Sequence, residues 1–308
     1  ASMREAFVET VEHRRFAEFC DACRHYRYIG LCYGSPGVGK TLSARRYARW
    51  EALAAVDVYR LSDAEVRALG TPTALFYTPG VVNTPRSIGE EIGRGRALLH
   101  RIAREAIHRE QRAAAAKRRA DYEQQRDGWL HVRGEMASDR PDLPPEPDYA
   151  ALMQEFAEQD AAILDPTRLI LIDEADRLKM ASLEAARDLF DRSNLGLILI
   201  GMPGIEKRMA RYPQFYSRIG FVHEFRPLSV SEVRRLLGEG WRPAGVTLGP
   251  DDEDSIASIV RVTGGNFRLL HRLLAQAERI ARLNGLDAIT GPVVDAARES
   301  LVIGSSLA

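Results

Sequence analysis

Short apolar runs and longer amphipathic stripes alternate along most of the chain. The short runs suit strands that are covered on both faces, and they span residues 28–33, 74–77, 169–172, 195–200 and 221–225. A further β-like stretch covers residues 56–59. Stripes with helical spacing lie around them, at residues 4–24, 40–53, 87–126, 149–162, 181–192 and 205–211. Strands that alternate with helices predict an α/β fold in which helices flank a parallel sheet.

The pattern changes after Pro227. Helical stripes then follow one another at residues 229–237, 250–262, 267–283 and 292–301, and we expect no further strand. We therefore predict three parts: an N-terminal helix within residues 1–27, an α/β domain over 28–227 and a small all-helical domain over 228–308. A charged helical insertion lies within the α/β domain at about residues 100–160.

Composition narrows the class of protein without pointing to a partner. The 308 residues are 45% hydrophobic and 28% charged, as in ordinary globular proteins. The 43 basic residues balance the 43 acidic ones, so net charge does not indicate nucleic-acid binding. No apolar run approaches the ~18 residues of a membrane span, and no signal-peptide pattern is present, so we expect a cytoplasmic protein without a membrane partner.

A glycine-rich segment of the GxxxxGK[ST] type follows the first strand and precedes a helix, which is the context of a phosphate loop. Its glycines let successive backbone N–H groups point at phosphate oxygens, and the helix adds its positive dipole end. Lys40 can reach the β- and γ-phosphates, and the Thr41 hydroxyl can ligate Mg²⁺. A turn without a ligand would leave both residues unexplained. We predict ATP binding by Gly34, Ser35, Pro36, Gly37, Val38, Gly39, Lys40, Thr41 and Leu42.

Two carboxylates directly follow the apolar run at residues 169–172. Asp173 is placed to hold Mg²⁺ through water, and Glu174 can polarise the water that attacks the γ-phosphate. The alternative is a helix N-cap with acidic residues in its first turn, which Asp173 and Asp176 would also supply. Because the chain also carries a phosphate loop, we favour a Mg·ATP site with Lys40 and Glu174 as catalytic residues and Thr41 and Asp173 as metal ligands.

The chain has three cysteines, Cys20, Cys23 and Cys32. A single CxxC pair is weak evidence for zinc or redox chemistry. Cys20 and Cys23 also fall on the apolar stripe of the first helix, so we favour core packing over a metal or redox site.

Four features of the chain together resemble an AAA+ ATPase. They are the phosphate loop, the Asp-Glu strand, a later apolar strand and a helical region with the turn Gly264-Gly265-Asn266-Phe267-Arg268. Within that superfamily, residues 197–204, 211–221 and 225–228 are similar to transposition ATPases of the MuB, TniB and TnsC type. The resemblance implies a P-loop AAA+ sheet with a helical lid, Mg²⁺-dependent ATP hydrolysis and a homo-oligomer that forms a ring or filament. It also implies double-stranded DNA, a transposase and a target-selector protein as partners.

The resemblance further assigns three arginines. Arg218 lies where the family keeps an arginine finger, which reaches the γ-phosphate bound by the neighbouring subunit, and Arg211 is the second candidate. Arg268 matches the sensor 2 arginine, which contacts the nucleotide in its own subunit. An ordinary surface arginine is the alternative for each. The chain departs from the family at Gly201-Met202, where many relatives have a polar sensor 1 side chain. Either a backbone group replaces that side chain or hydrolysis is slow.

The charged insertion is a second departure, because relatives have a short connection there. Its first half is rich in arginine and its second half in acidic residues. Three uses remain open: a protrusion that contacts a protein partner, a basic arm on DNA, and a solvated decoration. Partner contact is the functional use that we favour, because pairing between the two halves would leave little charge for phosphates.

Non-specific duplex binding is expected from the loops that follow the second strand and the Asp-Glu strand, with Asn83, Thr84, Arg86 and Lys179 as contacts. The sequence thus indicates an ATP-dependent DNA-binding ATPase that oligomerises on DNA and regulates transposition by selecting target DNA and recruiting a transposase. Two alternatives remain: a helicase loader or replication initiator of the same superfamily, and a nucleotide-gated protein scaffold without a DNA ligand.

Overall fold

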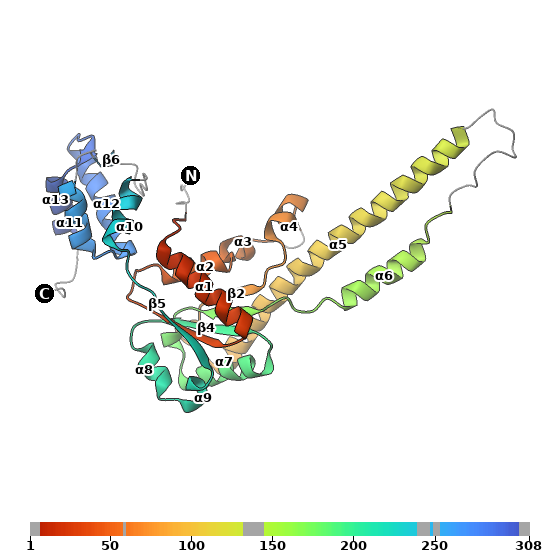
Figure 1. Cartoon of the computed structure of the whole chain (residues 1–308), viewed down its shortest axis with the longest axis horizontal. Coiled ribbons are helices and arrows are strands. Elements are labelled where there is room, and N and C mark those ends of the chain that lie inside the picture. The colour runs from red at the N-terminus through yellow and green to blue at the C-terminus, as the bar shows by residue number, and fades with distance from the viewer. Residues whose placement is uncertain (1–6, 58–59, 132–144, 239–246, 249–252, 302–308) are drawn as a thin grey trace. The chain divides into compact units, whose positions relative to one another are not determined.

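A computed structural model of the chain describes residues 7–57, 60–131, 145–238, 247–248 and 253–301. Its central sheet has five strands in the order β2-β3-β4-β1-β5 (Figure 1). The strands are β1 Ile29–Tyr33, β2 Ala74–Tyr77, β3 Leu169–Ile172, β4 Gly196–Gly201 and β5 Ile219–Glu224. β1 pairs in parallel with β4 and β5, and β3 pairs in parallel with β4. The predicted α/β fold with a parallel sheet flanked by helices is confirmed.

Helices cover both faces of this sheet (Figure 1). One face carries α1 (Val11–Tyr26) and α2 (Lys40–Tyr47), and the other carries α7 (Met180–Arg192), α8 (Ile205–Ala210) and α9 (Pro213–Tyr216). Every residue of β3 and β4 is buried, which explains why both appear in the sequence as continuous apolar runs. The strand order places β1 and β3 on either side of β4, so the two motifs that follow them meet at one edge of the sheet.

The chain divides into two compact units, one made of residues 1–50, 76–89 and 168–308 and the other of residues 51–75 and 90–167. The helices that lie wholly or mostly in the second unit are α3 (Trp50–Ala54), α4 (Asp63–Leu69), the 47-residue α5 (Pro85–His131) and α6 (Tyr149–Ala161).

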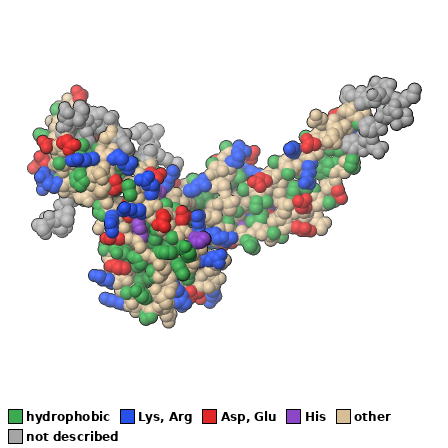
Figure 2. Space-filling view, viewed as in Figure 1, with side chains coloured by type: hydrophobic (Ala, Val, Ile, Leu, Met, Phe, Trp, Pro, Cys, Tyr) green, Lys and Arg blue, Asp and Glu red, His purple; other side chains and the backbone are tan. Residues whose placement is uncertain are grey.

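The charged insertion pairs with itself inside the second unit. Arg96 Nε lies 2.6 Å from a carboxylate oxygen of Asp165, and Arg104 binds Asp160 through two nitrogens, with its Nε at 3.0 Å. Figure 2 shows basic and acidic side chains over α5, whereas α6 carries acidic side chains and no basic ones. The predicted pairing of the basic and acidic halves is therefore confirmed at Arg104 and Asp160, whereas Arg96 and Asp165 pair just outside the predicted insertion.

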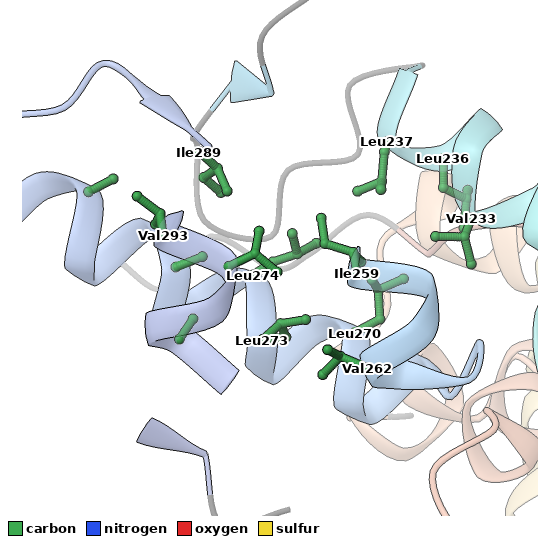
Figure 3. Close-up of a cluster of buried hydrophobic side chains, with 14 of the residues drawn as sticks. Val233, Leu236, Leu237, Ile259, Val262, Leu270, Leu273, Leu274, Ile289 and Val293 are labelled. Carbon is green, nitrogen blue, oxygen red and sulfur yellow. The ribbon is translucent and has the colours of Figure 1, made fainter. Parts of the chain in front are cut away.

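The part of the chain after Pro227 is mostly helical, with α10 (Val230–Gly238), α11 (Glu253–Thr263), α12 (Phe267–Leu283) and α13 (Gly291–Ser300). All four helices contribute to one buried apolar cluster, which includes Val233, Ile259, Leu270 and Val293 (Figure 3). The expectation of no further strand is wrong, because β6 (Thr247–Leu248) pairs in parallel with β7 (Ala288–Ile289). Strands of two residues are too short to leave an alternating pattern in the sequence. The predicted all-helical domain is thus corrected to a mostly helical one, and its boundaries stay a prediction.

Several elements before β2 differ from the predicted pattern. α1 begins at Val11 rather than at residue 4, because the Thr10 side chain caps it by accepting a hydrogen bond from His13 N at 3.0 Å. The predicted helix at 40–53 is split into α2 and α3, because Arg49 between them has a left-handed backbone with φ of 53°. Within the β-like stretch at 56–59, the first two residues are not in a strand and the other two lie outside the described residues.

Neither a metal cluster nor a membrane-spanning helix occurs among the described residues. Cys20, Cys23 and Cys32 are all buried and none forms a disulfide. Burial raises the pKa of the Cys23 thiol to about 12, which keeps this side chain protonated and unreactive. The cysteines therefore pack in the core, as favoured from the sequence.

Candidate active site

The phosphate loop runs from the end of β1 into α2, and its glycines meet specific geometric demands. Gly37 and Gly39 have φ of 83° and 114°, a region that other residues rarely adopt. Gly34 lies so close to a neighbouring segment that a Cβ there would be 2.3 Å from the carbonyl oxygen of Phe225. The loop can therefore curve tightly only with glycine at these positions, and a phosphate can approach its backbone closely.

Lys40 is the first residue of α2, and only 9% of its surface is exposed. Its ammonium donates hydrogen bonds to the carbonyl oxygens of Gly34 and Ser35, the latter at 2.9 Å. Desolvation lowers the pKa of Lys40, because burial disfavours the charged form. A buried cation beside the N-terminus of a helix forms an environment suited to a phosphate group.

Thr41 and Asp173 lie in contact across the same edge of the sheet. The Thr41 hydroxyl donates a hydrogen bond of 2.7 Å to Oδ2 of Asp173, which is 3% exposed. Burial raises the pKa of Asp173, and the hydrogen bonds from Thr41 and from the Glu174 backbone partly offset this effect. A hydroxyl and a carboxylate held together next to a phosphate loop are the oxygen donors that Mg²⁺ requires, so the residues present fit this ion.

Glu174 follows directly and has a left-handed backbone with φ of 49°. This conformation starts the short 3₁₀ turn Ala175–Arg177, where an Arg177 guanidinium nitrogen forms an ion pair with Oε2 of Glu174. Glu174 nevertheless lines the same cavity as Lys40 and Thr41. Its carboxylate is thus placed beside the space in which a phosphate would lie.

This cavity has a volume of about 390 Å³ and receives side chains from the helical region after Pro227. Arg268, which was predicted to contact the nucleotide, lines it together with Phe267 and His271. Two hydrogen bonds tie this region to the phosphate loop: Asn266 Nδ2 donates to Pro36 O at 2.7 Å, and Arg268 N donates to Gly37 O at 2.9 Å.

The end of β4 shows what occupies the predicted sensor 1 position. Oδ2 of Asp176 accepts a hydrogen bond of 2.7 Å from Met202 N. A Cβ on Gly201 would lie 2.7 Å from the same carboxylate oxygen, so a side chain there is excluded by close approach. The polar group at this position is therefore a carboxylate from the turn after β3, together with the backbone of β4.

The two finger candidates lie outside this cavity. Arg218 forms an ion pair with Asp191 and donates to Gln214 O, and Arg211 is exposed. This placement leaves the finger role of both arginines a prediction, since the role requires a second subunit.

The predicted DNA contacts are placed differently from one another. Thr84, Arg86 and Lys179 are exposed, so they stay predictions. Asn83 requires a correction: it is 8% exposed, and its amide nitrogen donates to Gly80 O and to Arg177 O, both at 3.1 Å. It fixes the loop after β2 rather than presenting a donor to phosphate.

Sequence reasoning missed several residues of the site: His271 and Phe267 in the cavity, Asn266 as a tie to the loop, and Asp176 beside β4. Asn266 has a local signal, because it caps α12 by accepting a hydrogen bond from Leu269 N. The other three depend on contacts between segments that are distant in sequence.

Comparison with known proteins identifies the family. A family model described as an AAA domain matches residues 23–209, more than half of the chain. The chain belongs to this AAA family. A protein of Staphylococcus aureus described as a "Potential ATP-binding protein" is 39% identical to this AAA protein over 311 residues, which cover 97% of each.

Solved structures agree with the family at the level of the fold. RuvB of Thermotoga maritima, described as a Holliday junction branch migration motor, is 15% identical with a TM-score of 0.50 over 97% of this chain and 71% of its own. Cdc6p of Pyrobaculum aerophilum is 15% identical with a TM-score of 0.56 over 99% of this chain and 71% of its own. Orc1 of Aeropyrum pernix, solved in complex with DNA, is 18% identical with a TM-score of 0.52, over 97% and 67%. At this identity the likeness shows a shared AAA fold and no more.

Proposed function

We propose that this AAA protein binds and hydrolyses ATP, assembles on duplex DNA with ATP bound, and regulates transposition. The observation that carries the ATPase assignment is the convergence of Lys40, the Thr41–Asp173 pair and Glu174 on one cavity. Two segments that are far apart in the sequence supply these groups, Lys40 with Thr41 and Asp173 with Glu174. Their chemistry matches the parts needed for phosphoryl transfer to water.

Each residue has a defined task in the proposed reaction. Lys40 and the loop backbone hold the phosphates, and Arg268 contacts them from the helical region. Mg²⁺, held by Thr41 and Asp173, would add positive charge beside the phosphate oxygens. Glu174 accepts a proton from the attacking water as its oxygen bonds to the γ-phosphorus and the bond to the β-phosphate oxygen breaks. The products are ADP and phosphate.

Arg218 is proposed to complete the site of a neighbouring subunit. Such a finger can raise kcat by roughly 10³ to 10⁵, so turnover by separated subunits would be slow. ATP binding would thereby favour a ring or filament, and hydrolysis would release it. The β4 backbone and Asp176 occupy the sensor 1 position, so slow turnover does not follow from a missing polar group there.

The DNA and transposition assignments are supported by the sequence of residues 197–228, which resembles transposition ATPases, and by the exposure of Thr84, Arg86 and Lys179. Contacts of this kind to phosphates fix position without reading sequence. We therefore propose non-specific duplex binding that weakens steeply with salt, together with a transposase and a target selector as protein partners.

Fluorescence anisotropy tests this function directly. Random-sequence duplex DNA is titrated with the protein at low salt, with and without a non-hydrolysable ATP analogue. We expect tight binding only with the analogue. Binding of the analogue without any DNA binding would overturn the DNA assignment and favour a nucleotide-gated scaffold. A second assay adds a transposase to the protein and duplex DNA. ATP-dependent capture of the target DNA by the transposase separates the transposition role from that of a helicase loader.

A further inference from the structure

Three aromatic rings gather near the point where α1 ends and β1 and β5 begin. They belong to Tyr26, Tyr28 and Phe221, and their centroids lie 5.8 to 6.2 Å apart. Arg27 lies between the two tyrosines in the sequence. We propose that this aromatic cluster is a contact site for single-stranded DNA, with bases on the two tyrosine rings and a phosphate on Arg27.

The first support is the exposure and the geometry of the tyrosine rings. Tyr26 is 59% exposed and Tyr28 is 45% exposed. Their ring planes are 15° from parallel, with centroids 6.2 Å apart. Phe221, which is half-buried on the edge strand β5, contacts both rings at 5.8 Å. Neighbouring rings with exposed surface can each stack on a base, because every base has a flat π face.

The second support is the unusual backbone of Arg27. It ends α1 with φ of 57° and ψ of 49°, in the left-handed region that favours glycine. Its N–H donates to Cys23 O, a bond that glycine would supply equally well. The side chain is exposed and forms no ion pair with any described residue. The guanidinium therefore has no described structural partner, whereas a phosphate would provide one.

The third support is the chemistry of the residues beside the rings. Arg24 and His25 precede Tyr26 and are both exposed, and the His25 ring packs edge-on against Tyr26 at 4.7 Å. The nearest acid along the sequence, Asp21, is held by Arg24 in an ion pair of 2.8 Å. Residues 24–28 thus alternate basic side chains and rings without a carboxylate, as in sites that bind single-stranded nucleic acid.

The aromatic cluster lies at the edge of the sheet opposite to the nucleotide cavity. β1 and β5 are parallel, with Ile29 paired to Ile219, so both strands begin at this edge, whereas the phosphate loop follows the carboxyl end of β1. A single strand on the cluster therefore does not compete with ATP. Stacking and phosphate contacts need no 2′-hydroxyl, so the choice of DNA over RNA rests on the proposed function, in which the protein acts on DNA.

The test measures the anisotropy of a labelled oligothymidylate at low salt without any nucleotide. We expect wild type to bind it, and Tyr26→Leu to bind it at least about fivefold more weakly, because one stacked base is lost. Tyr26→Phe keeps the ring and should bind as wild type. The matched control is Tyr216→Leu, since Tyr216 is 64% exposed on α9 and has no ring contact with any described residue.

Arg27→Gly separates the phosphate contact from a structural role. It should weaken binding and reduce the slope of log K against log salt by about 0.7, as expected for one phosphate contact to a single strand. Because glycine suits a φ of 57°, the midpoint of urea unfolding should stay at or above the wild-type value. Unchanged binding and an unchanged slope would overturn the role given to Arg27.

Other outcomes also decide the proposal. Failure of wild type to bind the oligothymidylate, or equal binding by Tyr26→Leu, would overturn the site. Loss of self-association in Tyr26→Leu with oligothymidylate binding intact would assign the rings to a subunit interface instead. Tighter binding of oligouridylate would overturn the choice of DNA, and any other result retains it. ATP-dependent binding of duplex DNA should be the same in wild type and in these variants, so its absence from all of them counts against the proposed function alone.

Discussion

The side chain of Arg218 is bound within its own subunit by Asp191, whose Oδ1 lies 2.6 Å from Nε of Arg218. Asp191 also holds Arg187, whose Nη1 lies 2.8 Å from the other carboxylate oxygen. If Arg218 is the finger, it must leave Asp191 before it can reach a phosphate in a neighbouring subunit. The ion pair therefore competes with assembly.

Asp191→Asn should lower the protein concentration at which turnover per subunit is half-maximal. A partly exposed ion pair contributes up to about 1 kcal/mol, so we expect a shift of roughly twofold to fivefold. Arg218→Ala should instead reduce kcat by roughly 10³ while ATP remains bound. ATPase rates measured over a range of protein concentrations test both variants. Arg192→Ala, which removes an exposed ion pair with Asp188 on the same helix, is the control and should behave as wild type.

Glu174→Gln should bind ATP normally, lose turnover and accumulate as oligomer. The amide keeps the size of the side chain but cannot accept the proton from water, so the ATP-bound state persists. Sedimentation velocity with Mg·ATP measures the oligomer, and a phosphate-release assay measures turnover. Wild-type turnover in this variant, or a monomer in the presence of ATP, would contradict the role given to Glu174.

Asp173→Asn should stabilise the nucleotide-free protein at neutral pH while abolishing turnover. Burial raises the pKa of Asp173, so its contribution to stability is complete only below its ordinary value of 3.8 and is lost as pH rises through the higher folded-state value. The asparagine side chain cannot ionise, so the variant does not lose this stability as the pH rises. Urea unfolding at pH 7 should therefore have a higher midpoint in the variant, and the difference should shrink as pH falls toward 4. A lower midpoint at pH 7 would show that the Thr41 bond outweighs desolvation.

Asn266→Ala should weaken ATP binding, because it removes the bond to Pro36 and the cap of α12. Loss of such a cap costs about 1 kcal/mol, and we expect the Kd for ATP to rise roughly tenfold as the loop loses its tie. Asn284→Ala at the other end of the same helix is the matched control, since its amide bonds only within α12, to Ile280 O at 2.8 Å, among the contacts described. Equal losses in both variants would mean that helix stability, rather than the tie to the loop, controls binding.

Elements with strong local signals were predictable from the sequence. β3 and α12 have the predicted bounds, because one is a continuous apolar run and the other carries a long stripe behind an Asn cap. The phosphate loop and the Asp-Glu pair were expected to meet, since parallel strands end at one edge of a sheet. Their convergence on one cavity matches that expectation.

Features that depend on distant contacts were not predictable. Nothing local distinguishes Asn83, an apparent surface amide, from a phosphate contact until Arg177 is found beside it. The pairing of Arg218 with Asp191 likewise joins two elements across 27 residues. The missed helix α4 is a different case, because the Ser62–Glu65 capping box was present in the sequence as a start signal.

The hydrogen bonds from Asn266 and Arg268 to the phosphate loop attach the first turn of α12 to that loop at two points. Leu270, one turn further along, is locked into the same apolar cluster as residues of α10, α11 and α13. The four helices are therefore coupled to the phosphate loop. A change in the curvature of this loop must tilt all four helices together, since their tightly packed interior does not deform locally.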